Sequence, residues 1–317
     1  MSVFSLRDDR GPDAAVEFAG HRIVAVRLER RGAAAGVAAH AVVPLAPGAL
    51  VPALGTANVI ARPAVAGALA AALERIGRPA RLGVVLADPV ARVSLIRFQH
   101  VPGRAAELEQ LIRWQMKKAL PFAVEEAQVT YAPAGRTAEG QEFLVTLART
   151  DVVREYEALC ADAGAVPGLV DVSITSVINA VLASTPADGG DRLLVHAAPD
   201  STSLAVLRGA TVVLLRNRAS DGDGSLADLV HQTAMYYEDR LGGRGFSQVL
   251  VSGGMDAGVG EADAALRHDL HERLGVPVRA LDASTVSTLH PGALSADVGR
   301  ALLPTAGLLL RHQRSAA

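Results

Sequence analysis

Hydrophobic and polar positions along the chain predict two separate sets of paired strands. Residues 14–29 form two short apolar segments around a turn at Gly20. Residues 192–208 repeat this pattern and are followed by a turn at Gly209 and a third apolar segment over 211–216. Turn residues at each reversal are typical of β-hairpins. We therefore expect each half of the chain to open with a hairpin.

Helices alternating with strands follow each hairpin. In the first half, the spacing predicts a helix over 64–76 that ends at Gly77, then a buried strand over 81–87. The second half is expected to contain, in order, helix 226–241, strand 248–252, helix 261–274 and strand 276–280. Paired strands followed by this alternation are typical of α/β lobes with mixed sheets. Because both halves share the order of their elements, we interpret them as a divergent duplication.

A different unit, residues 90–147, interrupts the first half. A strand over 92–98 precedes a helix over 104–120, and Pro121 ends that helix. One face of the helix is apolar at a spacing of three and four. That face consists of Leu108, Leu111, Ile112, Met116 and Leu120. Two strands, over 128–132 and 142–147, complete a small α/β subdomain.

These patterns divide the chain into three units. The first lobe is expected over 1–89 and 148–187, the inserted subdomain over 90–147, and the second lobe over 188–317. The last helix of the chain is expected to pack back on the first lobe. A further helix over 151–163 follows the insertion, and Thr150 is its expected N-cap.

Composition and charge exclude several classes of protein. A content of 50% hydrophobic and 20% charged residues excludes a disordered or fibrous chain. A net charge of −2 argues against nucleic-acid binding. The single cysteine, Cys160, excludes a disulfide framework and is expected to be buried in a helix. Only two of the 31 basic residues are lysines, Lys117 and Lys118, which is typical of codon bias in a GC-rich genome.

No segment is expected to direct export or to cross a membrane. Residues 1–10 lack an apolar stretch of signal-peptide length. Residues 32–61 carry no formal charge but contain three prolines and four glycines, so we expect a strand and a surface connection there. The expected location is cytoplasmic, with attachment to a membrane only through a partner.

Motifs for chemistry are sparse. The chain has no G-x-G-x-x-G after a strand, no P-loop and no G-x-S-x-G. His268 and His271 are three residues apart on a predicted helix, but without a third ligand they indicate a solvated face. The segment 200–203 is expected to be a hydrogen-bonded turn. The strand that runs into Gly253 and Gly254 would let the backbone approach a ligand closely.

Several segments, taken in order, resemble the PilM-like proteins of type IV pilus assembly. They are LGVVLADP (82–89), ELEQLIRWQM (107–116) followed by LPF (120–122), VDV (170–172) and LVSGGM (250–255). The resemblance covers about residues 14–311 and depends on the order of the segments. It implies an actin-like, ribonuclease H-like fold: a duplicated two-lobe α/β architecture with a small inserted α/β subdomain, related to the cytoplasmic domain of GspL.

The loops that hold nucleotide in this family are altered here. The family's hairpin turns read roughly Asp-Ile-Gly-Ser-Ser. This chain has EFAGH (17–21) and HAAPD (196–200), and Pro199 lacks an N–H for a phosphate. The resemblance therefore implies a degenerate cleft without catalytic residues or metal, in which Mg-ATP is not the expected cofactor. Its candidate residues are Glu17, Gly20, Asp171, Ser201, Gly253 and Gly254. Asp171 is equally explained as a cap for the helix from Ser173 onward.

The resemblance also implies a partner. It predicts a scaffold, without ATP hydrolysis, that binds the cytoplasmic tail of a PilN-like membrane protein between the inserted subdomain and the first lobe. Trp114, Pro121 and Phe122 are candidate anchors, although Trp114 and Phe122 are equally explained as core residues. One alternative is a working ATPase or kinase, with Glu17 and Asp171 as the carboxylates available. The other is a GspL-like component of a type II secretion platform.

Overall fold

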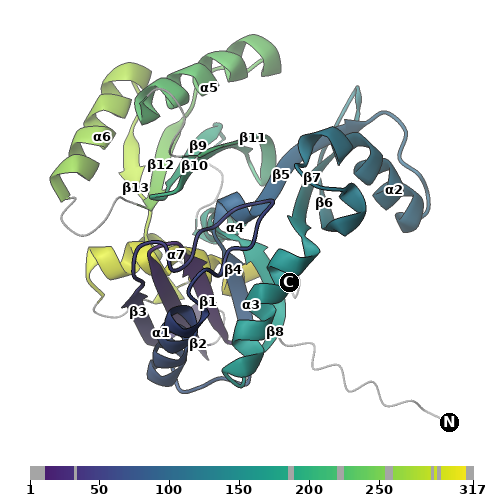
Figure 1. Ribbon diagram of the computed structural model, residues 1–317. Helices are drawn as coiled ribbons and strands as arrows, with labels where there is room; N and C mark the ends of the chain where they lie inside the picture. The colour runs from purple at the N-terminus through teal and green to yellow at the C-terminus, as the bar shows by residue number, and fades with distance from the viewer. Residues whose placement is uncertain are drawn as a thin grey trace.

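A computed structural model shows two α/β lobes and a smaller third unit beside them (Figure 1). The structure describes residues 11–31, 34–184, 189–219, 225–253, 260–286, 289–290 and 294–311. None of the helices within these ranges is long and apolar enough to cross a membrane.

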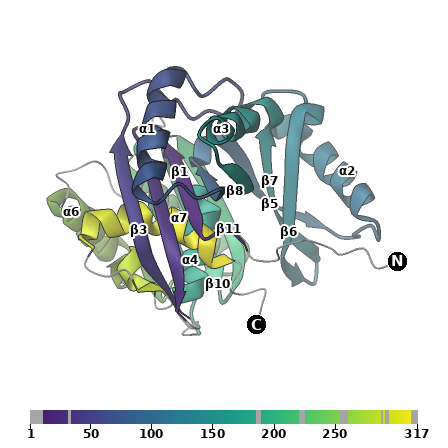
Figure 2. The same ribbon diagram turned by 90° about the horizontal axis from the view of Figure 1, so that it is seen from below.

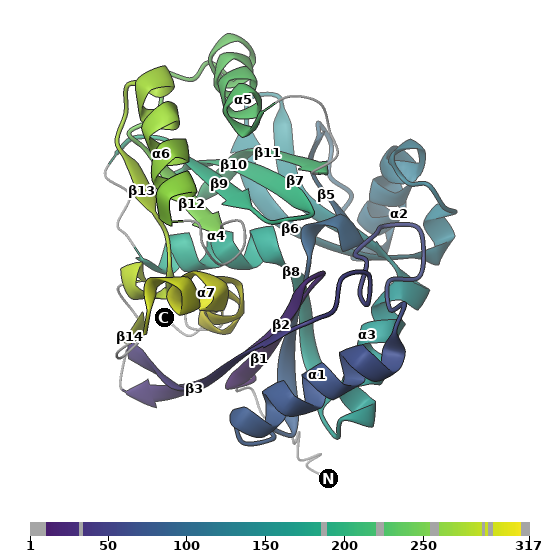
Figure 3. The same cartoon turned by 60° about the vertical axis from the view of Figure 1, so that its left-hand side comes forward.

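The first lobe contains a six-stranded sheet. In spatial order its strands are β14 (Leu289–His290), β3 (Ala34–Pro44), β2 (Arg22–Arg31), β1 (Ala14–Ala19), β4 (Arg81–Leu86) and β8 (Val166–Val172). Strands β1, β2 and β3 are antiparallel, whereas β4 and β8 run parallel to β1. Figure 3 shows α1 (Arg62–Arg75) and α3 (Thr150–Asp162) on one face of the sheet. Helices α4 (Ser173–Ser184) and α7 (Ala296–Leu310) lie on the other.

The second lobe repeats this arrangement with five strands. In spatial order they are β11 (Thr211–Ala219), β10 (Ser201–Arg208), β9 (Arg192–Ala197), β12 (Gln248–Gly253) and β13 (Val278–Ala280). The order and directions match β3, β2, β1, β4 and β8 of the first lobe, which confirms the duplicated α/β fold. Helices α5 (Leu226–Leu241) and α6 (Gly260–Leu274) belong to this lobe. A 3₁₀ turn, η4 (Ala283–Thr285), follows β13.

The inserted unit is a three-stranded antiparallel sheet with a helix. Its order is β5 (Ala91–Phe98), β7 (Gly140–Arg149) and β6 (Ala127–Thr137), and two 3₁₀ turns, η1 (Asp88–Val90) and η3 (Val124–Glu126), precede β5 and β6. Helix α2 (Ala105–Met116) packs on this sheet through the predicted apolar face. The helix is shorter than expected and ends in a 3₁₀ turn, η2 (Lys117–Ala119). Pro121 explains this end, because it forces Leu120 into an extended conformation (φ −110°, ψ 141°).

Helix α7 packs against the first sheet and is largely buried. It contacts β1, β2 and β4 and packs along α4, as Figure 2 shows from below. Its residues from Ala301 to Leu310 are all buried. The helices α4 and α7 approach closely because Gly307 has no side chain to separate them. The C-terminal helix therefore forms part of the first lobe's core.

Two predictions concern α3: that Cys160 is buried in it and that Thr150 caps it. Cys160 is buried in this helix, as expected. The prediction that Thr150 caps the helix is wrong, because Thr150 is its first residue and its hydroxyl donates to the carbonyl of Glu126 at 2.6 Å. The hydroxyl therefore links the helix to the turn before β6.

Candidate functional site

One hairpin turn from each lobe borders a narrow cleft. Gly20 follows β1 in the first lobe, and Asp200 precedes β10 in the second. The two turns are close, since a Cβ added to Gly20 would lie 3.6 Å from Oδ2 of Asp200. The start of α4 and residues Arg300 and Pro304 of α7 also line the cleft. The duplicated topology thus brings equivalent turns of both lobes to one place.

Glu17 of β1 is the first buried acid of the cleft. Its side chain is 5% exposed, and Oε1 accepts a hydrogen bond from the hydroxyl of Ser173 at 2.9 Å. Within the described residues Oε2 has no hydrogen-bond partner. Burial raises the pKa of Glu17 to about 7, although the positive charge of Arg22 opposes this change.

Asp88 is the second buried acid, and it joins the two lobes. It lies in η1, directly after β4, and Oδ1 accepts from the backbone N–H of Ile174 at 2.8 Å. Oδ2 accepts from the hydroxyl of Ser203 in the second lobe, which itself accepts from Nδ2 of Asn217 at 2.7 Å. Burial raises the pKa of Asp88 to about 6. We call the group of Asp88, Ser203 and Asn217 the latch.

The second lobe presents a histidine where the first presents Glu17. His196 of β9 is 6% exposed, and its Nδ1 lies 2.9 Å from the hydroxyl of Ser252 in β12. Burial lowers the pKa of His196 to about 4, so the imidazole is neutral at neutral pH. Asp200 also lines the cleft, and burial raises its pKa. The cleft therefore contains three carboxyl groups and the neutral imidazole of His196, and His21, Arg22 and Arg300 also line it.

The structure places the predicted cleft residues as follows. Glu17, Ser201 and Gly253 line the cleft. Gly253 has φ +82°, and a Cβ there would lie 1.9 Å from the carbonyl oxygen of Ala197, so this glycine lets the backbones of β12 and β9 lie close together. Gly20 adjoins the cleft beside Asp200. Gly254 lies outside the described residues.

Asp171 does not line the cleft. It accepts from the backbone N–H of Val172 at 2.9 Å and from the hydroxyl of Thr175, and it pairs with Arg311 at 3.4 Å. Its contacts thus connect β8 to the first turn of α4 and to the end of α7.

The expectation that Glu17 and Asp171 are the available carboxylates is wrong, because Asp88 and Asp200 occupy the cleft as well. Asp88 was not predicted, because it precedes a proline and resembles an ordinary turn residue. Its position at the carboxyl end of the strand beside β1 was the usable signal, because ligands of α/β sheets bind at that edge.

The cleft of this structure leaves little room for Mg-ATP. Its free volume is about 30 Å³, room for about one water molecule, whereas small-molecule pockets usually have several hundred Å³. A triphosphate would meet the carboxyl groups of Glu17, Asp88 and Asp200 as well as the guanidinium groups of Arg22 and Arg300. Pro199 removes a backbone donor from the second turn. Among the described residues, no group of three His, Cys, Asp or Glu side chains could hold a metal ion.

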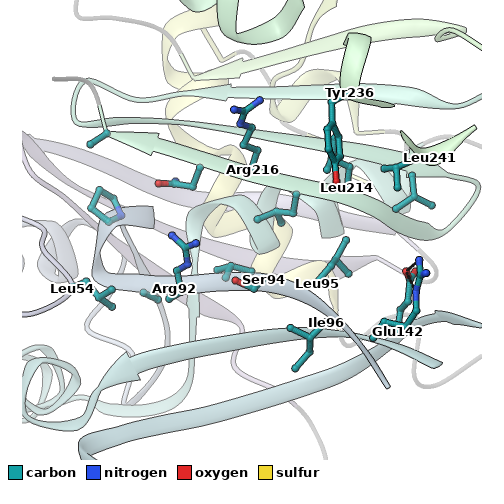
Figure 4. A pocket seen from close by; sticks show the side chains of 18 residues that line it. Leu54, Arg92, Ser94, Leu95, Ile96, Glu142, Leu214, Arg216, Tyr236 and Leu241 are labelled. Carbon is teal, nitrogen blue, oxygen red and sulfur yellow. Dashed lines mark hydrogen bonds and ion pairs between the residues drawn. The ribbon is translucent and has the colours of Figure 1, made fainter. Parts of the chain in front are cut away.

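A much larger groove of about 730 Å³ lies where the three units meet (Figure 4). One wall is β5, an edge strand of the inserted sheet, and the other is β11, an edge strand of the second lobe. Leu54 and Pro89 of the first lobe close one part of it. Its lining combines aliphatic side chains with exposed cations and one tyrosine. They include Leu95, Leu214, Leu241, Arg92, Arg216 and Tyr236. We call this the three-unit groove.

The predicted partner anchors do not line the three-unit groove. Trp114 is 73% exposed on α2, so the interpretation of Trp114 as a core residue is wrong. Pro121 lies beside the first lobe, where its Cγ would be 3.0 Å from a Cβ on Gly55. Phe122 is half-buried against the inserted subdomain's core, with the Arg149 guanidinium 5.9 Å from its ring centre.

Comparisons with known proteins agree with this architecture. The sequence pattern of one family, described as type IV pilus assembly protein PilM, matches residues 15–241. A search of curated proteins by sequence finds no match. Among solved structures, a PilM–PilN type IV pilus biogenesis complex has a TM-score of 0.76 at 19% identity, covering 96% of this chain and 98% of that chain.

Two further structures share the fold at a TM-score of 0.50. The cytoplasmic domain of EpsL, an inner membrane component of the Vibrio cholerae type II secretion system, is 12% identical and covers 96% of this chain and 95% of its own. A Bacteroides thetaiotaomicron protein with an actin-like ATPase fold is 8% identical, with coverage of 88% and 94%. At these identities the structures establish the actin-like fold alone.

Proposed function

This chain belongs to the family of type IV pilus assembly proteins PilM, and we propose that it is a cytoplasmic scaffold of a pilus assembly platform. In this proposal it binds the cytoplasmic tail of a PilN-like inner-membrane protein and does not hydrolyse ATP. The partner would hold it at the inner membrane. The pilus platform is preferred to a type II secretion platform because the family pattern that matches is that of PilM.

The contrast between the two cavities is the observation that carries this proposal. The cleft between the lobes has about 30 Å³ of free volume, and the latch joins the two lobes at Asp88, which lines it. The three-unit groove has about 730 Å³ and is bordered by two sheet edges. A protein with a nearly filled cleft and a large open groove is suited to bind a polypeptide and not a nucleotide.

The three-unit groove favours an extended segment. Edge strands offer unpaired backbone N–H and C=O groups, which an added strand can satisfy. Half-buried aliphatic side chains, such as Leu95 and Leu214, give contacts for alternate side chains of that segment. Arg92 and Arg216 are exposed at the groove and would suit a carboxylate of the tail.

Binding of the PilN-like tail tests this proposal. Replacing Tyr236, which is 49% exposed in the groove, by alanine should weaken binding of a synthetic tail peptide about ten-fold or more. Met235 is the matched control, because it is the adjacent residue of α5, is 46% exposed and does not line the groove. Isothermal titration calorimetry gives both affinities. Equal affinities of the Tyr236→Ala and Met235→Ala variants would contradict the assignment of the groove.

Nucleotide is expected to leave the melting temperature unchanged. A ligand present at about 100 times its Kd adds roughly 2.7 kcal/mol to the free energy of unfolding, and this raises Tm by several degrees. Thermal melts with millimolar Mg-ATP or ADP should therefore match the melt without ligand, whereas the tail peptide should raise Tm. A Mg-dependent rise with ATP would contradict the proposal that the cleft is inactive.

A further inference from the structure

The outer face of α2 carries an exposed tryptophan that neither the cleft nor the three-unit groove uses. Trp114 is the single tryptophan of the chain, and its side chain is 73% exposed. Figures 1 and 2 show α2 on the outer side of the inserted sheet, away from both lobes. A large aromatic side chain left in water in this way indicates a surface that is covered by another molecule.

Both lysines of the chain lie next to this tryptophan. Lys117 and Lys118 follow Trp114 by three and four residues, the spacing that places side chains on one side of a helical segment. Both are exposed, and within the described ranges neither forms an ion pair. The lysines therefore present positive charge to the solvent.

The other charges of α2 are neutralised within the helix. Arg113 pairs with Glu109 at 2.7 Å, and Arg104 pairs with Glu107 at 3.5 Å. Ion pairs at a spacing of three or four residues leave little net charge on their part of the surface. The end of α2 thus carries an exposed tryptophan next to two exposed lysines. We define Trp114, Lys117 and Lys118 as the α2 patch.

We propose that the α2 patch contacts the headgroup region of an anionic phospholipid membrane. Tryptophan is favoured at the boundary between headgroups and acyl chains, because its ring is apolar and its N–H can bind water or a headgroup. Lysine side chains reach along such a surface and bring their ammonium groups to lipid phosphates.

The contact is expected to be weak because the α2 patch is small. Its role in the cell depends on the proposed function. A membrane-bound partner in the three-unit groove would hold the protein near the bilayer and raise the effective concentration of the patch at the lipid. Two lysines and one tryptophan then suffice to fix the orientation of the protein against the membrane. The lipid contact itself is independent of the partner and can be measured without it.

The single tryptophan makes the test direct, because all tryptophan fluorescence of the full-length protein comes from the patch. Vesicles of phosphatidylethanolamine and phosphatidylglycerol (3:1), at millimolar lipid and low salt, should shift the emission to shorter wavelength. Vesicles of phosphatidylcholine should not. Replacing both lysines by serine should weaken co-sedimentation with the anionic vesicles about 30-fold, since each lysine near an anionic surface is worth about five-fold. Trp114→Ala should also reduce co-sedimentation.

The Tyr236→Ala variant separates this inference from the proposed function. It should lose the tail peptide but keep the vesicles, whereas the lysine variant should lose the vesicles and keep the peptide. An unchanged emission spectrum with anionic vesicles would overturn the lipid assignment. A spectral shift caused by the tail peptide and not by vesicles would also overturn it, and would assign the α2 patch to the partner protein instead.

Discussion

Replacing Gly307 by alanine is expected to destabilise the protein by about 3 kcal/mol. A Cβ at this position of α7 would lie 2.0 Å from the carbonyl oxygen of Ser176 and 3.1 Å from the Cβ of Ala180, both in α4. The oxygen belongs to the backbone of a buried helix, so it cannot turn away as a flexible side chain would. The two helices must therefore separate, and the core of the first lobe must loosen with them.

Gly67 provides the matched control for this substitution. It also lies inside a helix, α1, but a Cβ there would meet no atom within 4 Å. Alanine is the better helix former, so Gly67→Ala should stabilise the protein by up to about 1 kcal/mol. Urea unfolding followed by circular dichroism measures both variants. If Gly307→Ala changes the free energy of unfolding by less than about 0.5 kcal/mol, the close packing of α4 and α7 is incorrect.

The sequence was most informative where structure depends on neighbours in the chain. Residues 226–241 were predicted as a helix, and α5 has these bounds because Ser225 caps one end and Gly242 adopts φ +63° at the other. The apolar face of α2 was also predicted, since a spacing of three and four residues directly determines which side chains share a face. Thr150 shows the limit of this reasoning, because its hydroxyl donates to the carbonyl of Glu126, which is distant in the chain, and does not cap the helix.

The candidate site could be predicted only in part, because distant segments assemble it. Glu17 was identified through its place in a hairpin that resembles a family motif. Asp88 owes its role to Ser203, which is 115 residues away in the chain and lies in the other lobe. No local pattern encodes such a contact. The three-unit groove was missed for the same reason, since its walls β5 and β11 come from different units.

The cleft itself is expected to make the protein more stable at pH 6 than at pH 8. The pKa of Glu17 is about 7 in the folded protein, against an ordinary value of 4.5, so the folded state binds a proton more tightly than the unfolded state. Below pH 4.5 the carboxyl is neutral in both states and its burial carries no charge penalty. The penalty grows as pH rises from 4.5 to 7 and levels off above pH 7 at about 3 kcal/mol, by the equivalence of pKa shifts and free energy.

Two other buried groups shape the same pH profile. The pKa of Asp88 is about 6 in the folded protein, against an ordinary value of 3.8, so Asp88 also lowers the free energy of unfolding as pH rises. His196 acts in the opposite direction, because its pKa falls from 6.5 to about 4. Below pH 6.5 the unfolded state gains a proton on this histidine that the folded state does not, and this opposes part of the stability that the two carboxyls contribute as pH falls. Because the two carboxyl shifts together exceed the shift of the histidine, these three groups should make the free energy of unfolding rise steadily from pH 8 to pH 5.

Glu17→Gln removes the largest part of this pH dependence. The amide keeps an oxygen that can accept from Ser173, but it has no charge to bury. The variant should exceed the unmodified protein in stability at pH 8 by as much as about 3 kcal/mol, and the difference should shrink to below about 1 kcal/mol at pH 5. Glu74→Gln, at a carboxylate whose side chain is 67% exposed, is the control and should leave the profile unchanged. Urea unfolding at pH 5, 6, 7 and 8 measures all three proteins. If Glu17→Gln retains the slope between pH 6 and 8, Glu17 is not the group that titrates, and Asp88 and Asp200 become the carboxyls to replace next.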